Sequence, residues 1–597
     1  MPRLNSARNT LALLLLIFAP FSATFVQAQP VCPLPVEPPV ASLPFERPTE
    51  AIVTPDHRFV HSATHLQGQP AREKWAPGLI HRPAGTDIDE MTSAVVIDNP
   101  FDTPVTFTLT YFNHLGVDTG SIIVMPPAIC LPRTITLAAE ATHVEAATPL
   151  DPAAGCGAIG VGSARITVAA ASPNGIVGSV LHHTGEFFGG LVTDPDPTAP
   201  GAGAMEQLQV PQTTDRLLGG PFPLTFSATE AVLNGMAPMI AVLNPNPTAV
   251  VVALDLIIFD AAAGTTGTLP FRPLVIIPAQ GTLLEVTGPH LTALAGAANP
   301  GLWQNLLFTL LSSPGIDLDV SVQVRYLGSP QLPIMGSFIA TDFIGDEVQF
   351  DSEFRMASGM LQSTPSVNLM SPELSFQVIE HTDILLGNPG AVASDFTITY
   401  RSNTGVALST FTGTLPAGNS IRIVPGAFGY PAAPVGFGWV QINSCEPLFG
   451  WTVREIVDDP SVPFQYHKAY GEVLMNTQGA EPGSGFTVGG MTRKAVSIAR
   501  VGGGWPGYST AINNSVSNTL AYSWPFFDLG GTSCGANSFT GLPYAFASWT
   551  LEDPQAPLCS GNVSGRIDVT VGTVDGISIS GDPYREWGIP DFGTDPM

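Results

Sequence analysis

Residues 95–100 (VVIDNP) recur with little change at 240–245 (IAVLNP) and 384–389 (ILLGNP), and a weaker copy stands at 510–515 (TAINNS). The turn asparagines of the first three copies are 145 and then 144 residues apart. Proline has no N–H to donate to a sheet and pushes the residue before it toward an extended conformation, so each Asn-Pro pair ends a strand. The sequence therefore predicts one structural unit repeated about four times.

The segments after each turn carry the pattern of sheet strands. Alternate residues are apolar over 105–111 in the first copy and over 396–400 in the third, which indicates strands packed on one face. Another strand follows a small-residue turn at 137–145, 277–285 and 415–423. With 61 glycines, 57 prolines and no convincing amphipathic helix, the chain is predicted to be all-β, built of tandem antiparallel β-sandwich repeats. In general pattern these repeats resemble bacterial immunoglobulin-like sandwiches.

The repeat spacing predicts the domain organisation. Four sandwich repeats are expected, at 94–188, 236–336, 381–470 and 509–597. The intervals 189–235, 337–380 and 471–508 also contain apolar stretches, and they either add strands to a neighbouring core or pack between cores. An extended arm over 29–93 precedes the first repeat. We expect the repeats to form a rod.

The first residues have the layout of a cleaved export signal. Arg3 and Arg8 precede the apolar run 11–19, and the small-residue site Val26-Gln27-Ala28 follows. This pattern predicts a signal peptide over 1–28. No later stretch reaches the roughly 18 apolar residues of a transmembrane helix. The mature chain is therefore expected to be secreted, either extracellular or periplasmic, without a transmembrane segment.

The charge is strongly acidic and thinly spread. The chain has 49 acidic and 22 basic residues, for a formal net charge of −27. Such a surface repels phosphates, which argues against nucleic acid or an anionic lipid surface as the partner.

The six cysteines can pair in an oxidising compartment. Cys130 and Cys156 lie shortly before residues 165–168 (RITV), and Cys534 and Cys559 lie shortly before the similar 566–569 (RIDV). This matched spacing predicts the bridges Cys130–Cys156 and Cys534–Cys559, each worth on the order of 3 kcal/mol through the unfolded state. Cys32 and Cys445 remain, and pairing them would tie the arm to the third repeat.

Two clusters have residue types that bind metals. His57, His61 and His65 would share one face of a helix, but prolines flank the segment and a flexible arm is the favoured interpretation. The densest acidic patch suits calcium, yet it lacks the ligand spacing of a calcium loop, and a solvated loop is favoured: it comprises Asp342, Asp346, Glu347, Asp351 and Glu353. We therefore expect no cofactor, with calcium left open as an alternative.

No catalytic residue is assigned. The only serine motif of the nucleophile type, Gly483-Ser484-Gly485, lacks the flanking strand and helix of a nucleophile elbow. Motifs for zinc, phosphate and dinucleotide binding are absent from the sequence. Residue pairs that are brought together only by the fold remain open, either two carboxylates or a serine and a histidine.

Aromatic residues concentrate near the C-terminus, since six of the eight tryptophans lie in the last third of the chain. Flat aromatic faces stack on sugars and dominate protein interfaces, so the fourth repeat could be a recognition tip. The alternative is that these side chains fill the core of a divergent end repeat. The candidate ligand-binding aromatics are Trp505, Trp524, Trp549 and Trp587.

These features together favour a secreted, non-catalytic structural or adhesive protein. Its repeats would act as a spacer and interaction surface, with a protein or glycan on a cell surface or in the extracellular matrix as partner. Two alternatives stay open: a carbohydrate-binding module that uses the terminal aromatics, and a secreted hydrolase whose site is assembled by the fold.

Overall fold

The structure is a computed structural model. It describes residues 70–82, 91–114, 123–125, 127–130, 132–150, 160–184, 187–188, 191–192, 203–227, 232–235, 237–260, 265–286, 317–343, 354–361, 365–377, 380–402, 404–423, 437–456, 468–473, 475–476, 486–488, 491–501, 508–513, 519–542, 544–550, 563–571 and 577–582. Every strand pairing in this part of the chain is antiparallel. The described residues contain no α-helix and one short 3-10 turn, Thr148–Leu150. The all-β prediction is confirmed.

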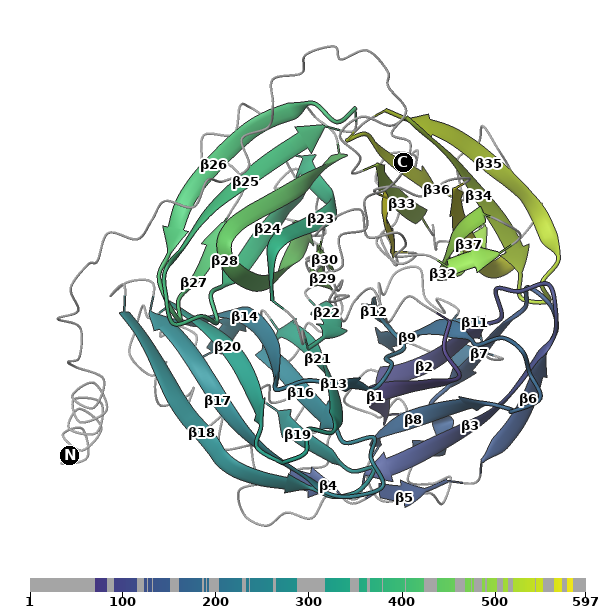
Figure 1. Ribbon diagram of the computed structural model, residues 1–597, viewed down its shortest axis with the longest axis horizontal. Helices are drawn as coiled ribbons and strands as arrows, with labels where there is room; N and C mark the ends of the chain where they lie inside the picture. Colours follow the sequence, from purple (N-terminus) through teal and green to yellow (C-terminus); the bar gives the residue numbers. More distant parts are fainter. Residues whose placement is uncertain are drawn as a thin grey trace.

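The strands form four pairs of sheets that follow one another around a ring (Figure 1). In repeat 1 the first sheet has the order β1-β8-β3-β6 and the second the order β7-β2-β9-β12. The strands are β1 (Glu73–Arg82), β2 (Met91–Asp98), β3 (Val105–His114), β6 (Arg133–Leu137), β7 (Thr142–Ala146), β8 (Val161–Val168), β9 (Val177–Thr184) and β12 (Gly203–Gln207). Four short strands accompany them: β4 (Ile123–Met125), β5 (Pro127–Ile129), β10 (Phe187–Phe188) and β11 (Leu191–Val192).

Repeat 2 has the same strand order. Its first sheet runs β14-β20-β17-β18 and its second β19-β16-β21-β22. The strands are β14 (Arg216–Ser227), β16 (Ala237–Leu243), β17 (Val250–Asp260), β18 (Thr265–Ile277), β19 (Thr282–Val286), β20 (Asp317–Tyr326), β21 (Pro333–Phe343) and β22 (Phe354–Met360), with β13 (Gln212–Thr213) and β15 (Val232–Gly235) at the edges.

Repeat 3 merges two positions of this plan into one long strand, β28. Its sheets run β23-β28-β25-β26 and β27-β24-β28-β29. The strands are β23 (Ser366–Gln377), β24 (Glu380–Gly387), β25 (Ser394–Ser402), β26 (Ala407–Leu415), β27 (Ser420–Ile423), β28 (Phe437–Ile456), β29 (Lys468–Val473) and β30 (Met475–Asn476).

Repeat 4 is described with a three-stranded second sheet, β36-β33-β38, beside a first sheet that runs β32-β37-β34-β35. The strands are β31 (Phe486–Val488), β32 (Met491–Val501), β33 (Tyr508–Asn513), β34 (Leu520–Asp528), β35 (Ser533–Gly541), β36 (Phe546–Thr550), β37 (Val563–Val571) and β38 (Ile577–Asp582). The strands β6, β18, β26 and β35, which hold the same position in the four repeats, lie at the rim of the ring (Figure 1).

The intervals between the predicted repeats either add strands to a neighbouring core or pack between cores. In the described residues they add strands to the cores. β12 and β14, both within 189–235, belong to repeats 1 and 2 respectively. Likewise β22 completes repeat 2 and β23 begins repeat 3. Each repeat thus begins one strand earlier than its Asn-ended strand. In repeat 1 this first strand, β1, lies within the expected arm 29–93.

Apolar side chains from both sheets meet between them and form the core of each of the first three repeats. The alternation over 105–111 holds, because Val105, Phe107, Leu109 and Tyr111 are all buried in the core of repeat 1. Removing these side chains from water supplies the main stabilisation of each sandwich.

The recurring asparagine ties the end of one strand to the two turns beside it. Asn99 Nδ2 donates to Thr103 O at 2.8 Å and to Ala138 O at 2.7 Å, and its Oδ1 accepts from Phe101 N. Asn244 makes the equivalent three bonds in repeat 2, and Asn388 does so in repeat 3 except that its second carbonyl, Leu415 O, is one residue earlier in the turn. All three asparagines are buried, so a side chain that could not bond these backbone groups would leave them unsatisfied.

The expected rod is wrong, because the four repeats close into a ring. The second sheet of each repeat packs on the first strand of the preceding repeat, and the second sheet of repeat 1 packs in the same way on β32 of repeat 4. A head-to-tail contact that repeats with a constant rotation generates either a filament or a closed ring. Here the rotation closes after four units (Figure 1).

A β-bulge in each first strand shapes these junctions. The pairing register shifts between Ala76 and Leu79 in β1, and at the corresponding places in β14, β23 and β32. A carbonyl in the bulge accepts a hydrogen bond from the next repeat: Pro77 O from Ser337 Oγ at 3.2 Å, and Pro221 O from Trp451 Nε1 at 2.7 Å. Both donors stand at the same register position, opposite the residue three before the turn asparagine.

We expect Asn388→Ala to lower the free energy of unfolding of repeat 3 by about 2–3 kcal/mol, because two buried carbonyls and one N–H lose their partner. Urea unfolding followed by tryptophan fluorescence measures the change. Thr412→Ala, at an exposed position of β26 in the same repeat, is the control and should change it by less than about 0.5 kcal/mol. Equal effects of the two substitutions would show that the turn does not depend on the amide.

Candidate functional site

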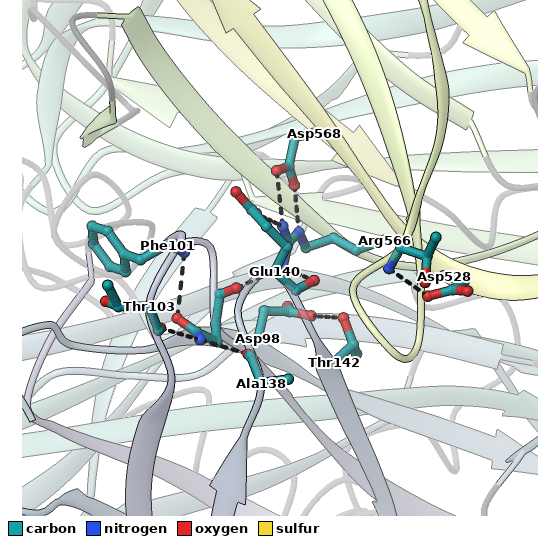
Figure 2. Close-up of polar contacts among 11 residues, drawn as sticks. Asp98, Phe101, Thr103, Ala138, Glu140, Thr142, Asp528, Arg566 and Asp568 are labelled. Carbon is teal, nitrogen blue, oxygen red and sulfur yellow. Dashed lines mark hydrogen bonds and ion pairs between the residues drawn. The ribbon is translucent and has the colours of Figure 1, made fainter.

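A buried arginine of repeat 4 lies at the contact that closes the ring. Arg566, on β37, is fully buried and reaches the turns of repeat 1 (Figure 2). Its Nη1 donates to Asn99 O at 3.1 Å and to Glu140 O at 3.2 Å. The first of these bonds joins residues 467 positions apart in the chain. The contact therefore holds the last repeat against the first.

Two carboxylates complete the set of acceptors. Arg566 Nε and Nη2 form a bidentate pair with Asp568, at 2.7 and 3.2 Å, and Nη2 also donates to Glu140 Oε2 at 2.6 Å. All five N–H donors of the guanidinium are thus satisfied. The Phe527 ring lies 5.0 Å from the guanidinium carbon and adds a cation–π contact.

The charges around Arg566 keep it cationic. Burial by itself lowers the pKa of Arg566, but the carboxylates of Asp568, Asp98 and Glu140 outweigh burial and raise this pKa above its ordinary value. Asp98 is itself buried and accepts a hydrogen bond from Thr142 Oγ1 at 2.6 Å. Removal of the guanidinium would therefore leave several buried negative charges without their cation.

The backbone of the two facing turns is shaped for close approach. Glu140 has a positive φ of 60°, as do the residues at the same turn position in repeats 2 and 3, Gln280 (54°) and Gly418 (71°). Gly531 has a φ of 86°, and a Cβ there would stand 2.1 Å from Ala139 O. Leu529 O accepts from Thr142 N at 3.1 Å across the same contact. Glycine is therefore required at 531 for the turns to meet.

The other junctions use aromatic packing at corresponding places. Arg165, which matches Arg566 in the sequence repeat, lies 5.6 Å from the ring centres of Trp75 and Phe112 beside repeat 2. Phe222, Phe338 and Trp451 pack edge to face where repeats 2 and 3 meet. Where repeats 3 and 4 meet, Trp439 Nε1 donates to Tyr544 O at 3.0 Å, and the Arg401 guanidinium lies 4.0 Å from the Tyr544 ring centre.

A second polar cluster brings a serine, a histidine and a glutamate together inside repeat 1. Ser93 Oγ lies 2.8 Å from His182 Nδ1, and His182 Nε2 lies 3.6 Å from Glu206 Oε1. Ser93 and His182 are fully buried, Glu206 is 5% exposed, and Ser93 Oγ also accepts a hydrogen bond from Ile80 N. No substrate can reach this serine in the structure, so the residues lack the accessibility that hydrolysis requires.

Burial sets the protonation of this cluster. It lowers the pKa of His182 to about 3. It also raises the pKa of Glu206 well above its ordinary value, against a smaller opposing effect of the Ser337 hydroxyl. His182 therefore stays neutral through the weakly acidic range.

The structure shows two of the four candidate ligand-binding tryptophans. Trp524 is 1% exposed, which favours the alternative that it fills the core, and its role in ligand binding stays a prediction. Trp549 lies on β36 opposite Ser509. Trp505 and Trp587 lie outside the described residues. Trp439 and Trp451, from the same aromatic-rich region, hold junctions.

The candidate metal clusters fall mostly outside the described residues. These include His57, His61 and His65, as well as Asp346, Glu347, Asp351 and Glu353, while Asp342 lies on β21 opposite Arg355. Within the described part of the chain, no group of three or more His, Cys, Asp or Glu side chains is arranged to hold a metal ion.

Three of the six cysteines lie within the described residues. Cys130, Cys445 and Cys534 are each disulfide-bonded. Their predicted partners, Cys156, Cys32 and Cys559, lie outside the described residues, so the pairing stays a prediction.

Sequence reasoning missed Arg566 and Glu140. A signal for both was present: residues 165–168 and 566–569 share an arginine, and the turn position of Glu140 is Gln280 in repeat 2 and Gly418 in repeat 3. The acidic residue thus occurs, among these three turns, in the one that meets Arg566.

No protein-family model matches this sequence, and no curated protein matches it. No helix in the described ranges is long and apolar enough to cross a membrane.

Arg566→Met should lower the free energy of unfolding by about 3–5 kcal/mol, because the buried Asp568 and the partly buried Glu140 lose their cation. Chemical denaturation measures this loss. Arg72→Met is the control, because Arg72 is exposed and donates to the backbone carbonyls of Ser172 and Ala169 away from the closing contact, so it should cost about 0.5–1.5 kcal/mol. Similar losses for both variants would refute the closing role of Arg566.

His182 should make the protein less stable in weak acid. Unfolded histidine takes up a proton near pH 6.5 whereas folded His182 does not until about pH 3, so stability is lost as the pH falls between these values. We expect wild type to lose about 2 kcal/mol more than His182→Gln between pH 7 and pH 5. Glu206 acts in the opposite direction in both proteins. Parallel urea-midpoint curves against pH for the two proteins would contradict this account.

Proposed function

We propose that the protein is an exported, non-catalytic scaffold with a structural or adhesive role. The observation that carries this proposal is the closed ring. The side chains best suited to chemistry, namely buried arginine, carboxylate and tryptophan, are used to hold neighbouring repeats together. Such a body keeps its outer sheet faces in fixed relative positions, which suits a spacer that presents an interaction surface.

The outer face of repeat 2 is the strongest candidate for that surface. Leu274, Ile276 and Leu327 are 59%, 56% and 43% exposed. Leu327 and Ile276 both adjoin Val251 of β17, since Leu327 N donates to Val251 O and Val251 pairs with Ile276. The three exposed side chains thus form one apolar group at the edge of this sheet.

Repeats 1 and 3 have polar pairs at the same register. In repeat 1, Thr106 and Thr136 take the places of Val251 and Ile276, and their hydroxyls are 2.9 Å apart. In repeat 3, Asp395 accepts a hydrogen bond from Thr414. Water-facing strands normally have such polar pairs, so the apolar group on repeat 2 favours contact with a protein partner on a cell surface or in the extracellular matrix.

Export is part of the proposal. The signal-like residues 1–28, the predicted pairs Cys130–Cys156 and Cys534–Cys559, and the general pattern of immunoglobulin-like sandwiches all favour an extracellular or periplasmic location. Carbohydrate binding is less well supported because Trp524 is buried, and hydrolysis because Ser93 is inaccessible. A partner of either chemical class, protein or glycan, would be met outside the cytoplasm.

Expression followed by separation of cytoplasm, periplasm, outer surface and medium tests the proposal. We expect a chain processed after Ala28, absent from the cytoplasm and partly retained at the surface. Leu274→Thr with Ile276→Thr, which copies the threonines of repeat 1, should move the retained fraction into the medium by about tenfold. Val406→Thr, an exposed apolar position on repeat 3, is the control. An unprocessed cytoplasmic chain, or equal retention of all three proteins, would overturn the proposal.

A further inference from the structure

The closing contact differs from the other junctions in how its two sides are connected. Repeats 1 and 2, 2 and 3, and 3 and 4 are each joined by the chain itself. Repeats 4 and 1 meet only through non-covalent contacts between distant residues in the described part of the chain, such as Arg566 with Asn99 and Glu140. Every copy of the protein therefore has both halves of a complementary contact.

We propose that these two halves can also join two copies, so that repeat 4 of one chain docks on repeat 1 of another. We call Asn99, Glu140 and Thr142 the closing head, and Leu529, Arg566 and Asp568 the closing tail. This inference deepens the proposed scaffold function and rests on it, since it names a second copy as a partner of the scaffold.

Charge and hydrogen bonding make the two surfaces specific for each other. The head supplies three acceptors to the tail: Asn99 O, Glu140 O and Glu140 Oε2. Asp568 supplies the other two acceptors of Arg566 from within the tail. In return, the tail accepts Thr142 N at Leu529 O. The contact is heterologous, and heterologous contacts are satisfied equally well within one chain or between chains.

Opening is expected at the closing contact, because the chain itself tethers the other three junctions and strand pairing or apolar packing strengthens the first two. β4 of repeat 1 joins the second sheet of repeat 2 by pairing with β19, and this strand crosses the first junction. Apolar clusters hold the first two junctions: Trp75 and Phe112 with Leu243 and Met335, then Phe222, Phe338 and Trp451. The side-chain hydrogen bonds described across the closing contact are made by one cation, Arg566.

Closure within one chain wins in the wild type because the tether keeps head and tail at a local concentration in the millimolar range, far above that of other copies. A second copy gains the advantage when a chain cannot satisfy its own contact. Two variants that block opposite halves create this condition. Glu140→Lys blocks the head and keeps the tail, whereas Arg566→Glu blocks the tail and keeps the head.

The experiment mixes these two full-length variants at about 10 μM each, a concentration at which interfaces of ordinary size associate. Light scattering after size-exclusion chromatography gives the mass. We expect a one-chain mass for wild type and for each variant alone, and a two-chain mass for the mixture. Arg325→Glu mixed with Asp255→Lys, a charge pair away from the closing contact, is the control and should stay at the one-chain mass.

Gly531→Ala provides a second tail-blocked chain that keeps all charges, because its methyl group would meet Ala139 O. It is used in place of Arg566→Glu if that variant loses its β-sheet circular dichroism, and its mixture with Glu140→Lys should also have the two-chain mass. A mixture of folded variants that keeps the one-chain mass overturns the inference. Surface retention of the wild type does not depend on this result, so the scaffold proposal is tested separately.

Discussion

One buried guanidinium lies at the centre of the contact that closes this chain into a ring. Arg566 satisfies all five of its N–H donors, three of them on the turns of a repeat that lies more than four hundred residues earlier in the chain. A buried cation is costly unless its charge and hydrogen bonds are matched, and here Asp568 and Glu140 match both. Arg566 holds the last repeat against the first together with the packing of β32 on the second sheet of repeat 1 and the hydrogen bond from Thr142 N to Leu529 O.

The first two junctions share one backbone arrangement. Each first strand contains a bulge, and in β1 and β14 the bulge presents a carbonyl to the next repeat. Ser337 and Trp451 stand at the same register position and donate to these carbonyls, although one is small and the other the largest side chain. The geometry is thus repeated by the backbone, while the side chains differ from junction to junction.

Much of the local structure could be predicted from the sequence, because it depends on short-range pattern. The repeated asparagines of 95–100, 240–245 and 384–389 located the strand ends, and alternation over 105–111 located a core face. β1 was missed because Pro77-Gly78, at its bulge, breaks the alternation that marks a strand. The role of Arg566 could not be derived, since it depends on the angle between repeats. Tryptophan enrichment was ambiguous, and Trp524 is buried.

The most direct test of the account is the shape of the mature protein in solution, measured by small-angle X-ray scattering. A closed ring of four sandwiches predicts a compact pair-distance distribution and a radius of gyration near the value for a globular chain of this length, about 25 Å. An elongated distribution, with a maximum dimension equal to four sandwiches placed end to end, would contradict the ring and support a rod-shaped arrangement of the repeats.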